Sequence, residues 1–282
     1  MMTDDIERGL RARVVRRTPI AGGEVCVATR LDLADGRCVF AKQHPAPPPG
    51  FFAAEADGLE FLRVPNGPRV PAVVSATDDH LVLEWIPEGR RRDKGDFGTR
   101  LAALHRAGSG LVWGDSPQST FLGILPLSGH GTKMCSWPSF WRTHRMLPIV
   151  DLARRQSRLS KSTQKRLEHH LDRLDDLLGH QPAPSRLHGD LWSGNRRVDV
   201  RGDSWIFDPS AQVGDREVDL AMMTLFGGFL QAELDAAVAD APLPSGWRDR
   251  RRAYQAFYLL VHVVLQGAHW GRQLDDTLSG LT

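Results

Sequence analysis

Residues 187–195 read Leu-His-Gly-Asp-Leu-Trp-Ser-Gly-Asn, and this stretch decides how the rest of the chain is interpreted. Asp190 stands five residues before Asn195, and a second aspartate, Asp208, follows thirteen residues later. Residues 205–207, Trp-Ile-Phe, predict an apolar strand that delivers Asp208. His, Gly, Asp, Ser and Asn are all common in turns, so the pair of Asp190 and Asn195 alone would equally fit a polar turn. The added strand and Asp208 favour the order found in phosphoryl-transfer enzymes.

The residue types fit that chemistry. Transfer of a phosphoryl group to a hydroxyl needs a carboxylate to receive the proton of the hydroxyl, and oxygen ligands to hold a metal ion against nucleotide phosphates. Asp190 is therefore the candidate catalytic base, and Asn195 and Asp208 are the candidate metal ligands. ATP and Mg²⁺ are the expected cofactors.

An N-terminal lysine is the candidate partner of the α- and β-phosphates. Lys42 ends the apolar strand expected over residues 37–42, and Glu55 lies thirteen residues later within a segment of helical spacing. A carboxylate on that helix would fix the lysine against the phosphates. An ordinary surface salt bridge is the alternative for the pair.

Two further segments are candidates for nucleotide contact. Gly22 and Gly23 let backbone amides approach phosphate oxygens, although adjacent glycines also make ordinary turns. Glu84 and Ile86 lie where the last strand of the N-terminal part ends, so their backbone is expected to pair with an adenine.

Composition limits the class of protein. Lys plus Arg number 36 and Asp plus Glu 34, and a net charge of +2 with scattered arginines argues against binding of nucleic acid. The cysteines Cys26, Cys38 and Cys135 have no paired spacing, which is typical of free thiols in the cytoplasm. The charged residues 1–13 lack the apolar core of a signal peptide, and residues 256–265 are too short to span a membrane.

The order of patterns predicts an α+β chain of two lobes, a small β-rich one followed by a larger, mostly helical one. Alternating apolar residues around Asp35-Gly36 and around Asp78-Asp79 predict two hairpins, separated by a helix over residues 52–62. Helical spacing dominates after residue 96 and is clearest from Ser160 to Leu178. We expect a nucleotide-binding lobe over 1–84 and a larger helical, catalytic and substrate-binding lobe over 85–282, with the hinge at 84–89.

Other polar groups in the sequence are weaker candidates for a functional site. Glu168-His169-His170 could suggest a metal cluster, but neighbouring helix positions point about 100° apart, so a solvated helix face is expected. His105 is expected to be an ordinary helix residue. His188 and Trp192, which flank Asp190, are assigned to the substrate side. For Trp192, burial in the core of the larger lobe is the alternative.

Residues 187–195, with 206–210 (Ile-Phe-Asp-Pro-Ser) and 214–229 (GDREVDLAMMTLFGGF), resemble the fructosamine kinase, or ketosamine-3-kinase, family. The similarity continues in residues 137–141 (WPSFW), Arg145 and residues 260–262 (LVH), and therefore spans nearly the whole chain. The family shares the aminoglycoside-phosphotransferase and protein-kinase-like fold. The resemblance implies ATP-dependent phosphorylation of a sugar hydroxyl of a ketosamine, such as O3 of a fructosamine or ribulosamine, in deglycation.

The resemblance and the composition together indicate which partners to expect. These are a small sugar-amine or a glycated protein, with no nucleic acid and no membrane, for a cytoplasmic monomer. One alternative is an aminoglycoside or choline kinase on the same fold, whose cationic acceptor would need an acidic rim. An alternative of another class is a nucleotide-binding module without catalysis. The simultaneous presence of Lys42, Asp190, Asn195 and Asp208 weighs against that module.

Overall fold

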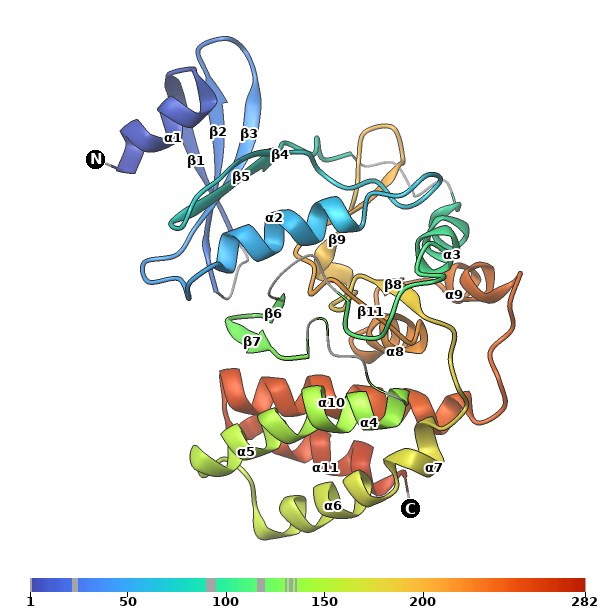
Figure 1. Ribbon diagram of the computed structural model, residues 1–282. Helices are drawn as coiled ribbons and strands as arrows, with labels where there is room; N and C mark the ends of the chain where they lie inside the picture. The colour runs from blue at the N-terminus through green and yellow to red at the C-terminus, as the bar shows by residue number, and fades with distance from the viewer. Residues whose placement is uncertain are drawn as a thin grey trace.

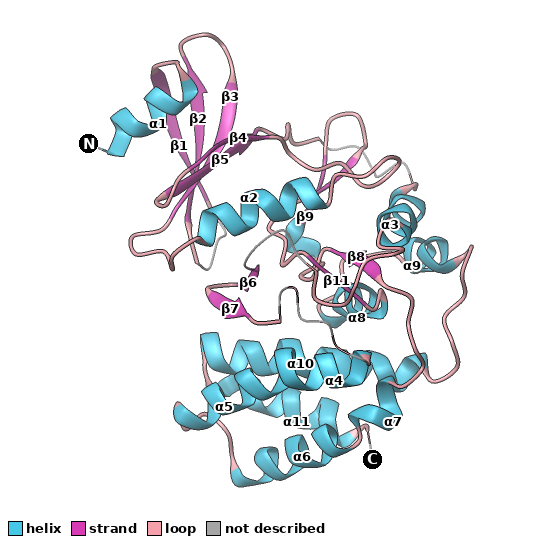
Figure 2. Ribbon diagram, in the orientation of Figure 1, coloured by secondary structure: helices cyan, strands magenta, loops and turns pink. Residues whose placement is uncertain are grey.

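The N-terminal part of the chain is a five-stranded antiparallel sheet between two helices (Figures 1 and 2). The computed structural model describes residues 2–21, 25–89, 95–115, 120–129, 131, 134 and 136–281. In the sheet order β1-β2-β3-β5-β4, the strands are β1 (Val14–Ile20), β2 (Val27–Leu33), β3 (Cys38–Gln43), β5 (His80–Glu84) and β4 (Val73–Ala76). Helix α1 (Met2–Leu10) packs on Leu31 and Val39 of one face, and α2 (Phe51–Phe61) packs against Leu81 and Leu83 of the other.

Both predicted hairpins are confirmed, whereas two elements before them were not predicted. The turn at Asp35-Gly36 joins β2 to β3, and Gly36 has a positive φ of 86°. Helix α1 escaped prediction because its first residues are mostly charged and only Ile6 and Leu10, four residues apart, are buried among its described side chains. Strand β1 escaped because Arg16 and Arg17 interrupt its apolar alternation.

The C-terminal part is mostly helical and adds three short strand pairs. Helices α4, α5, α6, α7, α10 and α11 form a layer at the end of the molecule opposite the sheet (Figure 1). The helices are α3 (Phe97–Arg106), α4 (Trp137–Trp141), α5 (Leu147–Arg155), α6 (Lys161–Asp172), α7 (Leu174–Leu178), α8 (Glu217–Leu225), α9 (Gln231–Val238), α10 (Trp247–Gln266) and α11 (Gly271–Ser279). The strand pairs are β6 (Thr120–Leu122) with β7 (Leu125–Leu127), β8 (Ser185–Leu187) with β11 (Gln212–Gly214), and β9 (Arg196–Val198) with β10 (Ser204–Ile206).

The helix expected from Ser160 to Leu178 is two helices. Ser160 does cap α6, since its hydroxyl accepts the amide hydrogen of Thr163 at 3.0 Å. Helix α6 ends at Asp172, Arg173 follows it with a φ of −96° and a ψ of 1°, and α7 begins at Leu174. The expectation of a solvated face at Glu168-His169-His170 was wrong for His170, which lies on the buried stripe of α6 with Leu167 and Leu171.

One apolar cluster crosses from the sheet to the helices. It joins Phe52, Leu59 and Leu62 of the α2 segment to Leu104 of α3 and Leu220 of α8. All five side chains are fully buried. The boundary at residues 84–89 therefore stays a prediction, and the two lobes share part of their core.

The β9–β10 hairpin makes a second connection between the lobes. The backbone of Arg69, in the segment between α2 and β4, donates to Ser204 at 3.2 Å and accepts from Ile206 at 2.9 Å. The guanidinium of Arg69 pairs with Asp203 at 2.9 Å and lies over the ring of Trp205. The strand that leads to Asp208 is thus fixed to the end of α2.

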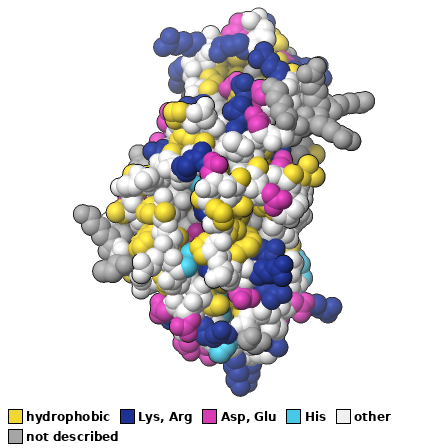
Figure 3. Space-filling model, turned by 90° about the vertical axis from the view of Figure 1, so that its right-hand side faces the viewer, with side chains coloured by type: hydrophobic (Ala, Val, Ile, Leu, Met, Phe, Trp, Pro, Cys, Tyr) yellow, Lys and Arg dark blue, Asp and Glu magenta, His cyan; other side chains and the backbone are white. Residues whose placement is uncertain are grey.

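Charges on the surface are mixed. On the face shown in Figure 3, basic side chains occur in separate groups with acidic side chains among them. No helix in the described part of the chain is long and apolar enough to cross a membrane.

Candidate active site

The 187–195 loop begins where β8 ends and folds back sharply at Gly189. This glycine has a φ of +79°, and a Cβ there would lie 2.0 Å from the carbonyl oxygen of Ser210. Only glycine fits this position without a backbone shift. The amide of Ser210 in turn donates to the carbonyl oxygen of His188 at 2.9 Å, so the loop and the segment after Asp208 lie against each other.

A buried aspartate on α8 binds the backbone of the 187–195 loop. Asp219 is fully buried and accepts the amide hydrogens of His188 at 2.9 Å and Gly189 at 2.8 Å. The ring of His105 on α3 reaches the same carboxylate at 3.1 Å. From α10, the hydroxyl of Tyr258 donates to the carbonyl oxygen of Gly189 at 2.6 Å. Three helices therefore fix the backbone that precedes Asp190.

Asp219 and Tyr258 were not singled out from the sequence. The available signal was an aspartate in the apolar run of residues 218–223, because a carboxylate on the buried face of a helix requires hydrogen-bond donors. Tyr258 carried no such signal. His105 lies in α3 as expected, but it is only half satisfied: Nε2 reaches Asp219 at 3.1 Å, and Nδ1 is buried with no hydrogen-bond partner among the described residues.

The carboxylate of Asp190 lies beside the amide of Asn195. Asn195 Nδ2 donates to Asp190 Oδ2 at 3.0 Å and to the Asp190 carbonyl oxygen at 2.9 Å. Burial raises the pKa of Asp190 to about 7, and the charge of Asp208 adds to that effect. A carboxylate with a pKa near neutrality is a better proton acceptor than an ordinary one while still being ionised in a large fraction of molecules.

Asp208 occupies an unusual backbone conformation. Its φ is +56°, a left-handed value that few residues other than glycine adopt. Such strain concentrates at functional sites. Helix α2 comes close behind the next residue, since a Cβ on Gly58 would lie 3.2 Å from the ring of Pro209. Strand β10 on one side and α2 on the other thus determine where the carboxylate points.

Lys42 lies between the carboxylates of Glu55 and Asp208. Its Nζ is 2.8 and 3.0 Å from the two oxygens of Glu55, and it also contacts Asp208 Oδ1. Lys42 and Glu55 are 12% and 8% exposed, so the pair is a buried one and not the surface salt bridge considered from the sequence. Burial raises the pKa of Glu55. At Asp208 burial also acts to raise the pKa, but the charge of Lys42 together with the hydrogen bonds of Glu55 and Lys42 outweighs it, so the pKa of that carboxyl is lowered.

The oxygens of Asn195 and Asp208 fit a divalent cation. All the hydrogen bonds that Asn195 makes with its side chain in the described part of the chain use Nδ2, one of them to the Asp208 carbonyl oxygen at 3.3 Å. Its Oδ1 is therefore available as a ligand beside the Asp208 carboxylate. Carboxylate and amide oxygens are the ligands that Mg²⁺ takes in phosphoryl-transfer sites.

A second group of possible metal ligands lies at the start of α8. His180, Asp215 and Glu217 have ligand atoms within 4.8 Å of one another. Their oxygens are already used, because Arg250 pairs with both oxygens of Glu217 at 2.7 and 2.8 Å and Tyr254 donates to Asp215 at 2.6 Å. These hydrogen bonds stabilise the start of α8.

A cavity of about 460 Å³, including its open mouth, lies between the lobes beside Asp208. Glu84 and Ile86 both line it, as expected for the segment whose backbone would meet an adenine. The Glu84 carboxylate accepts the amide hydrogen of Ala72 at 3.1 Å, and the Glu84 amide donates to the Ala72 carbonyl oxygen at 2.9 Å. Gly22 and Gly23 lie outside the described residues.

His188 does not lie on the substrate side. Its side chain is fully buried, with Nε2 2.9 Å from the carbonyl oxygen of Phe207 and Nδ1 3.3 Å from the amide of Asp190. Both ring nitrogens are thus occupied by backbone groups on either side of the site. The assignment of His188 to substrate contact is corrected, and we propose that it positions Asp190.

Trp192, by contrast, is 39% exposed and lies two residues after Asp190 in the chain. Its indole covers the backbone at Gly194, where a Cβ would come within 2.2 Å of the ring. The rings of Phe226, His262 and Trp270 continue this surface, with the Trp192 and Phe226 centroids 6.4 Å apart and the His262 and Trp270 centroids 4.6 Å apart. Trp192 is therefore outside the core.

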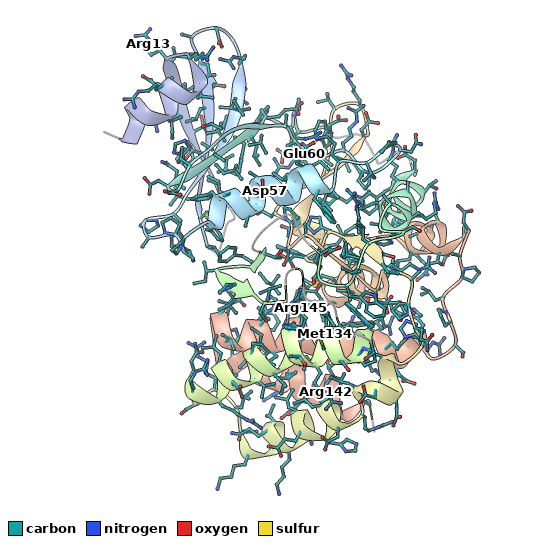
Figure 4. The ribbon with its side chains drawn as sticks, viewed as in Figure 1. Arg13, Asp57, Glu60, Met134, Arg142 and Arg145 are labelled. Carbon is teal, nitrogen blue, oxygen red and sulfur yellow. The ribbon has the colours of Figure 1, made fainter. Side chains whose placement is uncertain are left out.

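A buried arginine supports the strand next to the loop. Arg145, labelled in Figure 4 at the edge of the helical layer, lies in the π-helical segment Arg142–Met146 and is 2% exposed. Its Nε donates to the side chain of Gln212 on β11 at 3.0 Å, and Nη1 donates to the Ser128 carbonyl oxygen at 2.6 Å. Because β11 pairs with β8, this contact steadies the entry to the 187–195 loop.

Known proteins share this sequence and arrangement. A probable ketoamine kinase of Enterococcus faecium is 34% identical over 270 residues, which are 92% of this chain and 93% of the relative. A crystal structure from Thermobifida fusca, described as a fructosamine-3-kinase, matches with a TM-score of 0.88 at 35% identity and covers 99% of this chain and 97% of that one. A choline kinase from Streptococcus pneumoniae, at 14% identity, a TM-score of 0.66 and 99% coverage of both chains, shares the fold alone.

The α+β, protein-kinase-like fold implied by the resemblance is thereby confirmed. The model of the fructosamine kinase family matches residues 5–281, nearly the whole chain. The chain therefore belongs to the fructosamine kinase family and is a phosphotransferase that uses a sugar hydroxyl as its acceptor.

Proposed function

We propose that the protein transfers the γ-phosphoryl group of ATP to a hydroxyl of a ketosamine, namely O3 of a fructosamine or ribulosamine. The observation that supports this most strongly is the convergence of Lys42, Asp190, Asn195 and Asp208 at one end of the interlobe cavity. The family and the ketoamine kinase relatives support the acceptor class. Release of the amine after phosphorylation, and hence deglycation, is part of the proposal.

In this proposal the hydroxyl of the sugar donates its proton to Asp190. The raised pKa of Asp190 suits a group that must accept a proton near neutral pH. Asn195 Nδ2 donates to this carboxylate, and the ring of His188 accepts the backbone amide hydrogen of Asp190. Since Tyr258 and Asp219 fix the backbone just before it, the base is placed before the acceptor arrives.

The phosphates would lie against Lys42, with Glu55 keeping the ammonium in place. Asp208 and Asn195 would hold Mg²⁺, which neutralises charge on the phosphate oxygens. In this structure Lys42 contacts the Asp208 carboxylate, which would also bind the metal ion. We therefore expect the contact between Lys42 and Asp208 to lengthen when the nucleotide binds together with its metal ion. The adenine would meet the backbone at Glu84 to Ile86.

Trp192 would offer its flat face to the C–H groups of the sugar and to the substituted amine. An indole attracts a nearby ammonium by roughly 0.5–2 kcal/mol, depending on solvent exposure. The aromatic neighbours Phe226, His262 and Trp270 extend the apolar surface away from Asp190. This surface suits a ketosamine better than it suits a polycationic aminoglycoside.

The test is ATP consumption measured with purified protein and a matched panel of acceptors. The panel contains fructosamines and ribulosamines of small amines, the same adducts on lysine and on a glycated protein, free sugars, an aminoglycoside and choline. We expect turnover with the ketosamines and the appearance of a sugar-phosphate resonance in ³¹P nuclear magnetic resonance, followed by its slow conversion to inorganic phosphate as the amine is released. Turnover restricted to the aminoglycoside or to choline would refute the proposed acceptor while leaving the phosphotransferase assignment intact.

A further inference from the structure

Two neighbouring arginines on β9 point in opposite directions. Arg196 is 9% exposed, pairs with Glu233 of α9 at 2.7 Å and lies over the ring of Phe97 at 4.2 Å. Its charge is thus neutralised inside the C-terminal lobe. Successive side chains of a strand point to opposite faces. Arg197 therefore faces the other way, toward the cavity between the lobes, which it lines.

The cavity places Arg197 opposite the N-terminal sheet. Ile20, Phe40 and Leu83 line it from strands β1, β3 and β5, whereas Arg197 and Phe207 line it from the C-terminal lobe. Arg197 is the only basic side chain among the described residues that line this cavity. In register, Arg197 stands opposite Trp205 in the hairpin that reaches the N-terminal lobe (Figure 1).

The charge of Arg197 is weakly compensated. Its Nη1 lies 3.3 Å from Glu88, whose side chain is 73% exposed, and Arg197 itself is 32% exposed. Ion pairs of this kind hold a side chain in place only loosely. Glu88 follows Glu84 and Ile86 by a few residues, so the guanidinium lies at the end of the cavity where the base would bind, away from the phosphate end at Lys42.

A guanidinium is planar and its faces are poorly hydrated, so it stacks on rings and on nucleotide bases. We propose that Arg197 is a nucleotide-binding residue that stacks its guanidinium plane on the purine base and does not contact the phosphates. This inference rests on the proposed function, in that ATP occupies this cavity. It adds a base-binding residue from the C-terminal lobe to the backbone contacts proposed for residues 84–86.

The test separates the base from the phosphates. Binding of adenosine and of ATP is measured by calorimetry for the parent protein, Arg197→Ala and Arg197→Lys, without acceptor. Stacking predicts that Arg197→Ala weakens both ligands by a similar factor, roughly 3- to 30-fold. Lysine keeps the charge but not the plane, so Arg197→Lys is expected to behave like the alanine variant.

Two controls accompany these variants. Glu88→Gln removes the carboxylate beside Arg197 and is expected to leave adenosine affinity equal or slightly higher. Thermal unfolding of Arg197→Ala is expected to match the parent, because the side chain is partly exposed.

Three outcomes would overturn the stacking role. The first is a loss of affinity for ATP but not for adenosine, which indicates a phosphate contact. The second is parent-like affinity for adenosine in Arg197→Lys. The third is unchanged affinity for both ligands in Arg197→Ala. If neither ligand binds the parent protein, the proposed ATP site itself fails.

Discussion

The hydroxyl of Tyr258 donates to the carbonyl oxygen of Gly189 at 2.6 Å, which ties α10 to the residue just before the proposed base. We predict that Tyr258→Phe lowers kcat by about 3- to 10-fold, since one buried hydrogen bond contributes about 1 kcal/mol to holding the loop. ATP affinity should stay near that of the parent. Steady-state kinetics with a ketosamine and ATP calorimetry on one preparation provide the measurement. An unchanged kcat would show that Asp219 alone suffices to fix the loop.

The proposed base is tested by Asp190→Asn. The amide keeps the size of the side chain and an oxygen that Asn195 can reach, but it accepts no proton from the acceptor hydroxyl. Phosphoryl transfer should fall by ~10²–10⁴-fold with nearly unchanged ATP affinity. Turnover close to that of the parent protein would remove Asp190 from the role of base.

The metal ligands are distinguished by two alanine variants. Asp208 supplies an anionic oxygen and Asn195 a neutral one, so Asp208→Ala should abolish the Mg²⁺ dependence of ATP binding and Asn195→Ala should weaken it less. Titration of Mg²⁺ at fixed ATP in a calorimeter measures both. If Asp208→Ala keeps the Mg²⁺ dependence of the parent, the metal lies elsewhere.

Trp192→Ala separates substrate contact from structural support. Because the indole is 39% exposed, the variant should keep its melting temperature, whereas a core tryptophan would cost ~3–5 kcal/mol. The KM for a ketosamine should rise about threefold or more. Leu147→Ala, at 38% exposure on the far helical layer, is the matched control and should change neither value. A large fall in melting temperature with an unchanged KM would contradict the substrate contact.

His170 makes stability depend on pH. Burial lowers the pKa of His170 from 6.5 to about 4, and the charges of Arg173 and His169 add to that effect. As the pH falls below 6.5, His170 is protonated in the unfolded chain but stays neutral in the folded protein. The contribution of His170 to the free energy of unfolding is therefore complete above pH 6.5 and is lost as the pH falls toward 4. The 2.5 units between those pKa values amount to about 3 kcal/mol of unfolding free energy.

Urea unfolding at several pH values measures this effect. His170→Leu should lose much less stability between pH 6.5 and 4 than the parent does. His169→Gln, a change at the exposed neighbour, should keep the parent's profile. Parallel losses in the parent and in His170→Leu would assign the acid sensitivity to other groups.

The sequence singled out four residues that the structure places side by side, but not the residues that support them. The spacing of Lys42, Asp190, Asn195 and Asp208 is the one expected of a phosphoryl-transfer site, and their roles stay a prediction. Asp219 could not be placed from spacing, since its partners lie about thirty residues earlier along the chain.

Local patterns account for the errors in the fold. The apolar stripe of residues 160–178 has the same helical spacing before and after Arg173. The periodicity of the sequence therefore does not mark the break between α6 and α7. His170 was assigned to solvent because polar type was weighed above its position next to Leu167 and Leu171 on the same stripe. His188 was placed near the substrate by its neighbour Asp190, although the reversal at Gly189 turns its ring inward.

Helix α2 packs on β4 and β5 of the sheet with one side and on β6 and the segment after Asp208 with the other. A polypeptide cut in the 84–89 segment would therefore give two fragments, neither of which can cover this helix. The N-terminal fragment would present to water the side of α2 that carries Phe51 and Phe61, whose rings contact Phe121 and Arg186 of the C-terminal part, and would aggregate. The bilobal outline thus does not correspond to two autonomous modules, and exchange of the N-terminal lobe between relatives requires strand β6 and the segment after Asp208 to be exchanged with it.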